Sequence, residues 1–504
     1  MRTVWIWGDQ LNRDLAHLRG AVPDDSRVLL VVSGAKLTAR RWHVQKLHLV
    51  VSAMRHFAAE LEDRGFDVDL RRAPTMRAGL EAHVAEYRPD LVRAMEPASL
   101  TGDRLLRDLA GSGSLPCGLE VVDSDHFLCH WRDFDTWADG RDHLKMEDFY
   151  RWRRRETGYL MDGDQPAGGR WNLDHDNREP PTDDLADTAP EPVTSRLDDL
   201  DRDSVGWLPD STFGAPPDGT WATTRRRALA RLRHFVDHAL PRFGDHQDAM
   251  VSGAWALNHS LLSHALNLGL LHPREVCDAV EGAYRAGDAP LNAAEGFIRQ
   301  VIGWREYTWG VYRRWMPEYA HHNALGAVLD VPPAFTGEAD TDMACVADTV
   351  RHIHDHAYAH HIPRLMVLAN LATSAGIDPA RLTDWMHASF IDGYDWVMVP
   401  NVVGMGTFAD GGRMSTKPYV SGGAYIDRMS DHCGGCRYDR SKRVGADACP
   451  FTTLYWDFLD RHRDRLSGNH RLARAYHTLD RLKDLGSVRE RAGEVRQRLS
   501  DGTL

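Results

Sequence analysis

The sequence predicts an α/β N-terminal domain with a Rossmann-like parallel sheet, joined by a long connector to an all-helical C-terminal domain. Three observations lead to this fold class. Short apolar runs first alternate with helical periodicity, then Asp, Arg, Gly and Pro become frequent, and finally helical periodicity dominates. We therefore place the N-terminal domain at residues 1–130, the connector at 131–225 and the helical domain at 226–504.

The N-terminal domain contains five apolar runs that each have the character of a buried strand. Between them, apolar residues recur at helical spacing around 47–61, 77–87 and 104–110. Alternation of this kind predicts a parallel sheet that helices cover on both faces. The expected strands are Val4–Ile6, Val28–Val32, Phe66–Leu70, Leu91–Val92 and Leu119–Val122.

A ligand of such a sheet is expected beyond the carboxyl ends of its strands. Gly8, Asp9 and Gln10 directly follow the first predicted strand and therefore occupy this position. Asp9 can equally be no more than a helix cap. The sequence has no GxGxxG motif, which argues against a dinucleotide site of the usual kind.

Composition argues against a membrane protein and against a disulfide-stapled one. The 504 residues are 42% hydrophobic, but no apolar run approaches the ~18 residues that a membrane-spanning helix needs. Seven cysteines are too few, and odd in number, for a disulfide framework. The N-terminus enters a strand pattern without a signal-peptide pattern. We therefore expect a cytoplasmic protein, and we expect it to be a monomer.

The formal charge of −12 is unfavourable for a nucleic-acid partner, which needs a local basic surface. Two basic clusters, Arg151–Arg155 and Arg225–Arg227, can supply such a surface within an acidic whole. Each cluster also has the composition of an ordinary solvated helix face. Sixteen tryptophans suit a pocket for a flat aromatic ligand, although most tryptophans are core residues.

Two segments of the helical domain combine polar groups in a way that suits ligand binding. Asn258–Ser263 joins hydroxyl groups to a helix start, where phosphates find N–H donors. Trp304–Tyr307 mixes charged and aromatic side chains, which packing between helices would explain equally well.

A run of histidines ends at His361, shortly before Arg364. His352, His356 and His360 lie on one helical stripe, which is compatible with metal binding. Adjacent imidazoles beside an arginine fit acid–base chemistry better, because imidazole titrates near neutral pH and can both give and take a proton.

Cys433 and Cys436 are separated by two glycines, which is the spacing of a metal-binding turn. Cys449 follows with a proline after it, and Cys345 is the other cysteine of the surrounding helical region. Four thiolates make a closed metal site. Spacing alone leaves a structural zinc and an iron–sulfur cluster open, with a chance CxxC as a third reading.

Taken together, these residues resemble the photolyase/cryptochrome superfamily, and within it the iron–sulfur bacterial cryptochromes and (6-4) photolyases. The resemblance rests on the four cysteines, the His360–Arg364 stretch, the Trp304–Glu306 helix and the segment Asp392–Met405. It covers essentially the whole chain. It implies a light-dependent flavoprotein, with FAD in the helical domain and a [4Fe–4S] cluster among the C-terminal helices.

The resemblance also implies roles for individual residues. Arg364 and Asp392 would face the flavin ring as an ion pair, with Asn401 beside it. His361, with His360, would contact the DNA lesion, and the helix that carries Glu306 would line the same pocket. The residues expected near the FAD phosphates are His259, Ser260, Leu261, Leu262 and Ser263, and the expected cluster ligands are Cys345, Cys433, Cys436 and Cys449.

In this branch a light-harvesting antenna, 6,7-dimethyl-8-ribityllumazine, would lie in the N-terminal domain near Gly8–Gln10 and Lys46. The sequence departs from the family pattern at this place. Ser33–Gly34 stands where a carboxylate often follows the second strand, and His43–Lys46 reads His-Val-Gln-Lys where His-Lys-Gln-Lys is expected.

Two further roles follow from the resemblance. Trp385 fits the first step of electron transfer to the flavin, yet Met386 follows it where an aromatic residue is usual, and no tryptophan lies in the loop before Cys345. Relatives show Mg-assisted repair, which would place a Mg²⁺ at Asp174 in the connector.

The resemblance favours a light-driven (6-4) photolyase, which repairs UV-damaged DNA with an electron from reduced FAD and a proton from histidine. The main alternative is a cryptochrome-type blue-light photoreceptor with the same cofactors, because fold and cofactor do not fix function. A zinc-stabilised helical protein unrelated to light is the third hypothesis.

Overall fold

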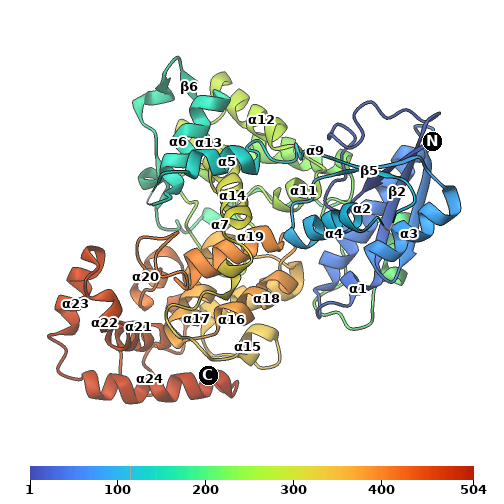
Figure 1. The fold of residues 1–504 in the computed structure, drawn as a ribbon. Coiled ribbons are helices and arrows are strands. Elements are labelled where there is room, and N and C mark those ends of the chain that lie inside the picture. Colours follow the sequence, from blue (N-terminus) through green and yellow to red (C-terminus); the bar gives the residue numbers. More distant parts are fainter. Residues whose placement is uncertain (114, 142) are drawn as a thin grey trace.

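The computed structural model describes residues 1–113, 115–141 and 143–504. A five-stranded sheet lies at one end, and helices make up most of the rest (Figure 1). All five strands of this sheet are parallel, in the order β3-β2-β1-β4-β5, which confirms the predicted α/β domain, while β6 (Met161–Asp162) and β7 (Gln165–Pro166) form a separate antiparallel pair. The strands are β1 (Arg2–Ile6), β2 (Ser26–Ser33), β3 (Asp67–Ala73), β4 (Leu91–Met95) and β5 (Gly118–Val122).

Helices cover both faces of this sheet. Val4 and Ile6 of β1 belong to the buried cluster that contains the apolar side of α2 (Val44–Glu62). Trp5 and Trp7 belong to another cluster, with α3 (Met76–Tyr87) and α4 (Leu100–Ser112). Successive strand residues point to opposite faces. Burial on both faces therefore explains why the strands read as continuous apolar runs.

The winding of the sheet reverses at β1, which lies between β2 and β4. In open parallel sheets the ligand crevice lies outside the carboxyl ends of the strands at this reversal. Gly8–Gln10 follow β1 and Glu96 follows β4, so these residues border the crevice. The predicted position of Gly8–Gln10 is thus reproduced by the topology.

The first part of the connector packs on the helical half. Helix α5 (Trp131–Ala138) contacts α14 (Glu306–Trp315), and α6 (Met146–Thr157) contacts the π-helical turn η5 (Arg299–Arg305). At Gly310 of α14, an added Cβ would lie 2.2 Å from ring atoms of Phe134. Only glycine therefore allows α5 and α14 to approach this closely.

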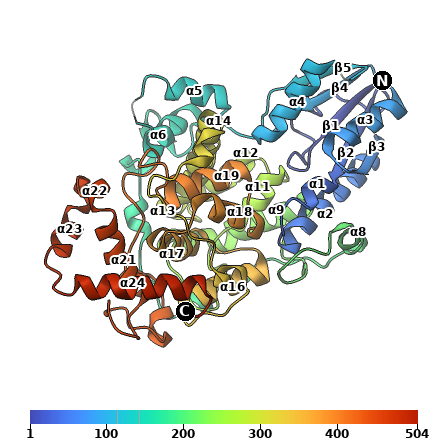
Figure 2. The ribbon, with the colours of Figure 1, turned by 60° about the horizontal axis from the view of Figure 1, so that its bottom comes forward.

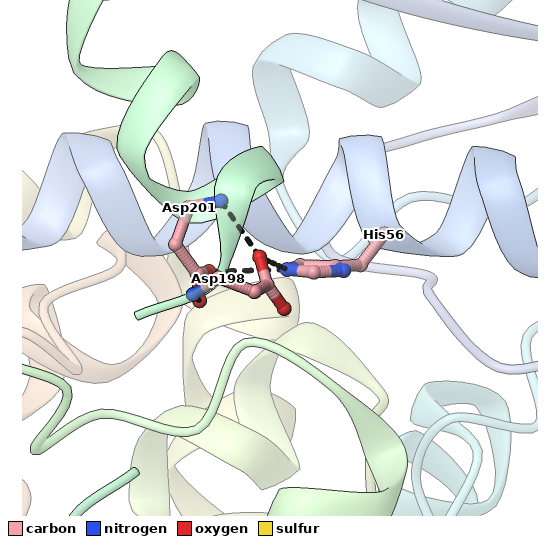
Figure 3. Close-up of side chains that lie close together, drawn as sticks. All are labelled: His56, Asp198 and Asp201. Carbon is pink, nitrogen blue, oxygen red and sulfur yellow. Dashed lines mark hydrogen bonds and ion pairs between the residues drawn. The ribbon is translucent and has the colours of Figure 1, made fainter. Parts of the chain in front are cut away.

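Asp201 of α8 (Asp199–Ser204) holds the second part of the connector against α2 (Figure 3). The Asp201 side chain is fully buried. Its carboxylate accepts hydrogen bonds from His56 of α2 at 3.1 Å and from Arg227 of α9 at 2.7 Å. Burial opposes ionisation, but bonds from His56, Ser52 and Arg227 hold the pKa of Asp201 well below its usual range. Arg227 also pairs with Asp198, so this one guanidinium joins both carboxylates of the cluster to α9.

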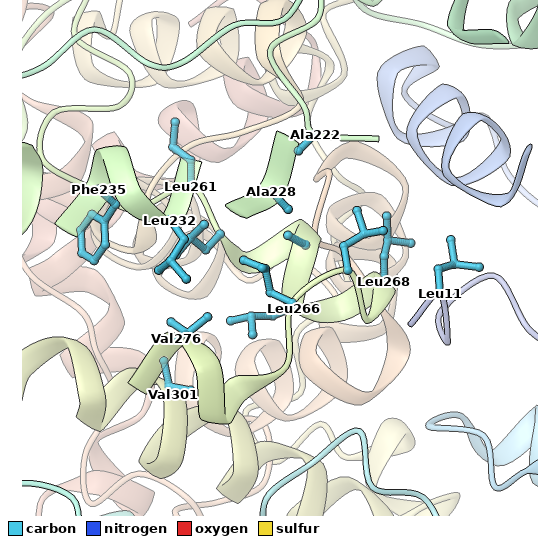
Figure 4. Packing of buried hydrophobic residues seen from close by; sticks show 14 of the residues in the cluster. Leu11, Ala222, Ala228, Leu232, Phe235, Leu261, Leu266, Leu268, Val276 and Val301 are labelled. Atoms are coloured by element: carbon cyan, nitrogen blue, oxygen red, sulfur yellow. The ribbon is translucent and has the colours of Figure 1, made fainter. Parts of the chain in front are cut away.

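One hydrophobic core extends from the sheet into the helical half (Figure 4). Leu11, which follows β1, packs in the same cluster as Leu266, Leu268 and Phe235. The Leu11 N–H also donates to the Leu268 carbonyl at 2.8 Å. The sheet and the helices are therefore joined by a continuous apolar interior.

The remaining chain is helical, as predicted, and Figure 2 shows α21–α24 at the end away from the sheet. Among the described residues, no helix is both long and apolar enough to cross a bilayer. The α-helices are α1 (Gly34–Leu37), α7 (Leu185–Thr188), α9 (Arg225–His234), α10 (Leu240–Phe243), α11 (Ser263–Leu268), α12 (Pro273–Ala286), α13 (Leu291–Ile298), α15 (Pro333–Thr336), α16 (Ala344–His356), α17 (Asn370–Ala375), α18 (Pro379–Ser389), α19 (Asp395–Val399), α20 (Gly423–Met429), α21 (Pro450–Arg461), α22 (Arg463–Leu466), α23 (Ala473–Leu479) and α24 (Leu485–Ser500). Besides η5, π-helical turns form η4 (Phe235–Ala239), η7 (Pro363–Ala369) and η8 (Pro400–Gly406).

Candidate active site

A cavity of about 320 Å³ lies within the helical half. Its size falls in the range of small-molecule sites, which is about 300–1,000 Å³. The wall is mainly apolar, with a few polar groups that converge on one side, as ligand sites usually have. The wall residues that the family resemblance singled out are His259, Ser260, Leu261, Leu262, Ser263, His361, Arg364, Asp392 and Asn401.

Three π-helical turns form much of this wall. The turn η5 contributes Trp304, η7 contributes Arg364 and η8 contributes Asn401. A π turn shifts the side chains that follow it relative to an α-helix, and such turns occur often at functional sites. The hydrophobic pattern of the sequence did not predict them, because a period is not resolved over a seven-residue turn.

Arg364 and Asp392 form a buried ion pair on this wall. Two nitrogens of Arg364 donate to the two carboxylate oxygens of Asp392, at 2.8 and 3.2 Å. The Ser263 hydroxyl donates to the same carboxylate at 2.7 Å. Burial opposes ionisation of Asp392, but Arg364 and Ser263 together hold its pKa below the usual range. The cavity thus has a fixed, paired charge at its edge.

The loop before α11 approaches the cavity with a strained backbone. Leu261 lines the wall in a left-handed conformation with φ of 52°, which is unfavourable for leucine. Within the described part of the chain, the N–H groups of Ser260, Leu261 and Ser263 have no hydrogen-bond acceptor. Free N–H donors on a cavity wall fit an anionic group such as a phosphate.

His361 lines the cavity, and its side chain is exposed there although protein surrounds it on most sides. Loss of bulk water lowers the pKa of His361 to about 4, and the positive charge of Arg364 adds to this effect. The imidazole is therefore neutral at pH 7 before any anionic ligand binds.

His360 lies behind the wall and is buried. Its ring stacks on His259 with a centroid separation of 4.3 Å. Burial and the neighbouring His259 keep the pKa of His360 well below its usual range. The structure thus brings His259, His360 and His361 together, but only His259 and His361 reach the cavity.

The structure does not bring Glu306 to the cavity, in contrast to the expectation for this residue. Its fully buried carboxylate accepts from Arg305 at 2.7 Å and from the Cys129 N–H at 2.8 Å. Arg305 and Thr308, on neighbouring positions, line the wall instead. Burial raises the pKa of Glu306, while Arg305 opposes the rise. Its observed contacts are those of a counter-ion to Arg305.

Two tryptophans line the cavity: Trp304 belongs to the Trp304–Tyr307 motif, and Trp396 lies in the segment Asp392–Met405 that carries the family resemblance. Trp396 is buried and lies 5.1 Å from Phe127, which stacks on Trp309 at 3.9 Å. Large aromatic walls suit a flat ligand. No spacing rule marks Trp396 in the sequence, because its position depends on how α19 packs against α14.

Asp174 lies in a group of four charged residues. It pairs with Arg299 at 2.8 Å and with Arg178. Burial raises the pKa of Asp248 to about 6, and the charge of Asp174 adds to this rise. Asp248 is therefore a second carboxylate beside Asp174, and the sequence did not indicate it, because the two positions lie 74 residues apart and share no motif.

The four predicted cysteines line one small cavity between α16, α20 and α21. Burial raises the thiol pKa values of Cys345, Cys433 and Cys449, that of Cys433 to about 12, and the neighbouring thiolates add to the rise, so a cation among them would be strongly favoured. Among the described residues, no three of these sulfurs lie within 4.8 Å of one another. At Gly423, an added Cβ would lie 2.9 Å from the Cys449 sulfur, so glycine leaves room for this site.

The structure separates the residues that are expected around the antenna. Gly8 and Asp9 directly follow the carboxyl end of β1, whereas Gln10 and Lys46 make hydrogen bonds elsewhere. Burial raises the pKa of Asp9, while Lys36 opposes the rise. Gln10 is buried and donates to the carbonyls of Met95 and Glu96, at 3.3 and 3.4 Å.

The Lys46 side chain makes hydrogen bonds to the helical half, in contrast to its expected role at the antenna. Its buried ammonium donates to the carbonyls of His387 and Gly393, which belong to the helical half. Burial lowers its pKa to about 7, and Asp392 and Asp395 oppose the change. Lys46 therefore ties α2 to the segment that carries Asp392.

Trp385 does not line the cavity, although its neighbour Met386 does. Its ring lies 6.2 Å from Phe390 and 5.2 Å from Phe335. The guanidinium of Arg364 lies 4.0 Å above the Phe390 ring. Phe390 thus separates Trp385 from the ion pair at the wall.

Comparison with known proteins agrees with this geometry. Residues 4–215 match the family model of the deoxyribodipyrimidine photo-lyase-related protein. A (6-4) photolyase of Agrobacterium fabrum (strain C58) is 41% identical over 493 residues, which cover 95% of this chain and 96% of that protein. The chain belongs to the photolyase/cryptochrome superfamily.

Solved structures of this superfamily share the whole fold. A class III photolyase from Agrobacterium tumefaciens has a TM-score of 0.60 at 18% identity, with 99% of this chain and 98% of that one covered. A cryptochrome from Synechocystis sp. PCC6803 has a TM-score of 0.56 at 13% identity, with 99% of each chain covered. At these identities the likeness concerns the photolyase/cryptochrome fold, in which FAD is the shared cofactor.

The cavity fits this cofactor of the superfamily. Aromatic and apolar walls suit the flat ring system, the ion pair provides polar groups at its edge, and free N–H groups before α11 suit its phosphates. The residues that would hold it are Arg364, Asp392, Asn401 and the loop His259–Ser263.

Proposed function

We propose that this chain is a light-driven (6-4) DNA photolyase. The proposal is supported by 41% identity over nearly the full length to a protein of that activity. The observation that carries it is the position of His361, which shares one cavity wall with the Arg364–Asp392 pair. A proton donor and the flavin-binding residues are thus within one space.

The reaction requires an electron, a group transfer and return of the electron. Excited reduced FAD would supply the electron when it is bound in the cavity. Within the lesion, a hydroxyl or amino group is transferred from one pyrimidine back to the other. The electron then returns to the cofactor, so the reaction involves no net redox change. Damaged bases stack poorly, which lowers the free energy needed to flip them out of the duplex.

The protein would position the reactants and control one proton. Arg364 and Asp392 orient the ring of the bound cofactor, and Trp304 and Trp396 exclude water from its neighbourhood. His361 donates a proton from its imidazole to the group that migrates, and accepts a proton afterwards. An anionic DNA backbone near His361 favours the imidazolium, which raises its pKa from the low value of the free site.

The four cysteines would hold a [4Fe–4S] cluster with a structural role. A tetrahedral zinc with Zn–S bonds of about 2.3 Å needs sulfur–sulfur separations of about 3.8 Å. Among the described cysteines, no three sulfurs lie within 4.8 Å of one another, so they are not gathered as closely as zinc ligands would be. A cubane has room between its ligands for four irons and four sulfides, so it fits this spacing better.

Two further cofactors belong to the same proposal. A 6,7-dimethyl-8-ribityllumazine antenna would lie at the crevice beyond β1, against Gly8 and Asp9. A Mg²⁺ would lie at Asp174 with Asp248 as the second carboxylate, because hard cations prefer oxygen ligands. Burial raises the pKa of Asp248 to about 6 and the charge of Asp174 adds to the rise, and a bound cation would oppose both effects.

A repair assay tests the proposal. Purified FAD-loaded protein is mixed with an oligonucleotide that carries one (6-4) lesion, and restored thymines are measured under blue light and in the dark. We expect light-dependent restoration in the wild type and at least a hundredfold loss in His361→Ala, with flavin content unchanged. Light-dependent DNA binding without repair would instead support the photoreceptor alternative.

A further inference from the structure

A second cavity, of about 410 Å³, lies outside the proposed active site. It is bordered by the end of α5, the end of α14 and the loop that follows η8. Three arginines, one histidine and one tryptophan contribute to its wall: Arg141, His143, Arg314, Trp315 and Arg413. A concentration of guanidinium groups is unusual on a chain whose formal charge is −12.

The loop that carries Arg413 is built around one buried carboxylate. Asp410 accepts hydrogen bonds from the N–H groups of Gly412 at 2.9 Å, Arg413 at 3.2 Å and Met414 at 2.9 Å. The Tyr319 hydroxyl also donates to it, at 2.8 Å. Gly412 has φ of 99°, which a residue with a Cβ adopts only under strain. The loop is therefore ordered before any ligand binds.

The arginines are held in place but keep free hydrogen-bonding capacity. Arg314 pairs with Asp135 and Asp139 at 2.8 and 2.9 Å. The Nε of Arg141 donates to the Trp137 carbonyl at 2.7 Å. Within the described part of the chain, neither Arg141 nor Arg413 has a carboxylate partner. Guanidinium groups without counter-ions at a concave surface fit a phosphate.

The distance to the proposed active site suits a DNA strand. Thr308 lines the first cavity and Arg314 the second, and both lie on α14. Six residues of α-helix rise about 9 Å, at about 1.5 Å per residue. A strand of duplex DNA advances about 3.4 Å per nucleotide, so this separation corresponds to roughly two or three nucleotides.

We propose that this second cavity binds a backbone phosphate of the damaged strand, two or three nucleotides from the lesion. The site rests on the proposed function, because it supposes that the lesion lies against His361 at the wall of the first cavity. Arg141 and Arg413 donate to the phosphate oxygens, whereas Arg314 borders the site but is paired with Asp135 and Asp139 and adds no net positive charge. A phosphate contact positions the strand and does not read its sequence.

Salt-dependent binding tests this site on the full-length protein. Fluorescence anisotropy gives Kd for a labelled duplex with one (6-4) lesion between 50 and 300 mM NaCl. We expect Arg141→Gln and Arg413→Gln each to raise Kd by about five- to tenfold, and to reduce the slope of log Kd against log salt by about 1. Arg413→Lys should retain most of the slope, because the charge remains. Thermal unfolding confirms that each variant is folded.

Two controls make the result specific. Arg474→Gln removes an exposed arginine of α23 that has no ion pair within the described chain and lines neither cavity, and it should leave the slope unchanged. A lesion with a single nucleotide on each side cannot reach the second cavity, so on this ligand Arg413→Gln should bind as the wild type does.

The outcomes separate this inference from the proposed function. If Arg141→Gln and Arg413→Gln both show the wild-type slope of log Kd against log salt on the long duplex, the phosphate site is refuted, even if repair is normal. A protein that shows the slope change but repairs no lesion would overturn the photolyase assignment and leave a phosphate site on a DNA-binding protein. An equal loss of affinity on the short and long ligands would also refute the proposed reach.

Discussion

The guanidinium of Arg364 and the carboxylate of Asp392 make two hydrogen bonds across 28 residues of sequence, at 2.8 and 3.2 Å. The pair joins the π-helical turn η7 to the segment before α19. Removing one partner would leave the other charge buried and unpaired, which is more costly than losing a surface ion pair.

We predict that Asp392→Asn destabilises the protein by about 3 kcal/mol and lowers flavin retention. The amide has nearly the same shape but cannot neutralise Arg364. Urea unfolding and the flavin-to-protein absorbance ratio measure both effects. Asp384→Asn, which removes an exposed partner of Arg40, should change stability by less than about 1 kcal/mol. Equal effects of the two substitutions would contradict the importance of the buried pair.

Acid should remove the contribution of Asp392. Because the folded-state pKa is lower than the unfolded value, this carboxylate stabilises the fold above the unfolded pKa of about 3.9, and the contribution is lost as pH falls through the folded pKa. Wild type should therefore lose stability below about pH 4, and the difference between wild type and Asp392→Asn should shrink there. Urea titrations at pH 3 and pH 7 measure this difference, and a constant difference would disprove the linkage.

The low pKa of His361, about 4, predicts a pH dependence of repair. If the imidazolium is the proton donor, the active fraction grows as pH falls, because the group is mostly neutral at pH 7. The repair quantum yield should thus rise from pH 8 towards pH 6, and His361→Gln should lose this rise along with most activity. A yield that falls over the same range would argue that the neutral imidazole is the active form.

Metal content distinguishes the two interpretations of the cysteines. We expect about four irons and four acid-labile sulfides per chain, and we expect Cys345→Ala to lose both. Cys117→Ala, which changes a cysteine outside this group, serves as the matched control and should retain them. One zinc per chain, without iron, would refute the cluster.

Glycine substitutions test the contact between α5 and α14. Gly310→Ala places a methyl group 2.2 Å from the ring of Phe134 and should destabilise the protein by about 1–3 kcal/mol. Gly282→Ala on α12 meets no atom within 4 Å and should stabilise it by roughly 0.5–1 kcal/mol, because alanine favours helix. Denaturant unfolding gives both changes in the free energy of unfolding, provided that the dependence on denaturant concentration is unchanged. If both substitutions stabilised the protein, packing at Gly310 would be looser than described.

The strands, the parallel topology and the helical half followed from the sequence, because apolar period and length are local properties of buried segments. The residues around the cavity were found through a family resemblance, and the structure brings most of them together. The side chains of Glu306 and Lys46 lie away from their expected positions, and both differences have the same reason. A motif locates a residue along the chain, whereas the direction of its side chain depends on the partners available, here Arg305 and two backbone carbonyls. Asp248 carried no local signal, since its position arises from packing between distant segments, and Trp396 was marked only as part of the segment Asp392–Met405.

The single apolar interior shared by the sheet and the helices also has an optical consequence. Excitation energy passes between two pigments at a rate that depends steeply on their separation and mutual orientation. Three contacts join the sheet domain to the helical half: Leu11 with Leu268, Lys46 with the segment that carries Asp392, and Asp201 with α2 and α9. A pigment at the edge of the sheet would therefore keep a constant orientation relative to the flavin, and its transfer efficiency would be a fixed property of the folded chain.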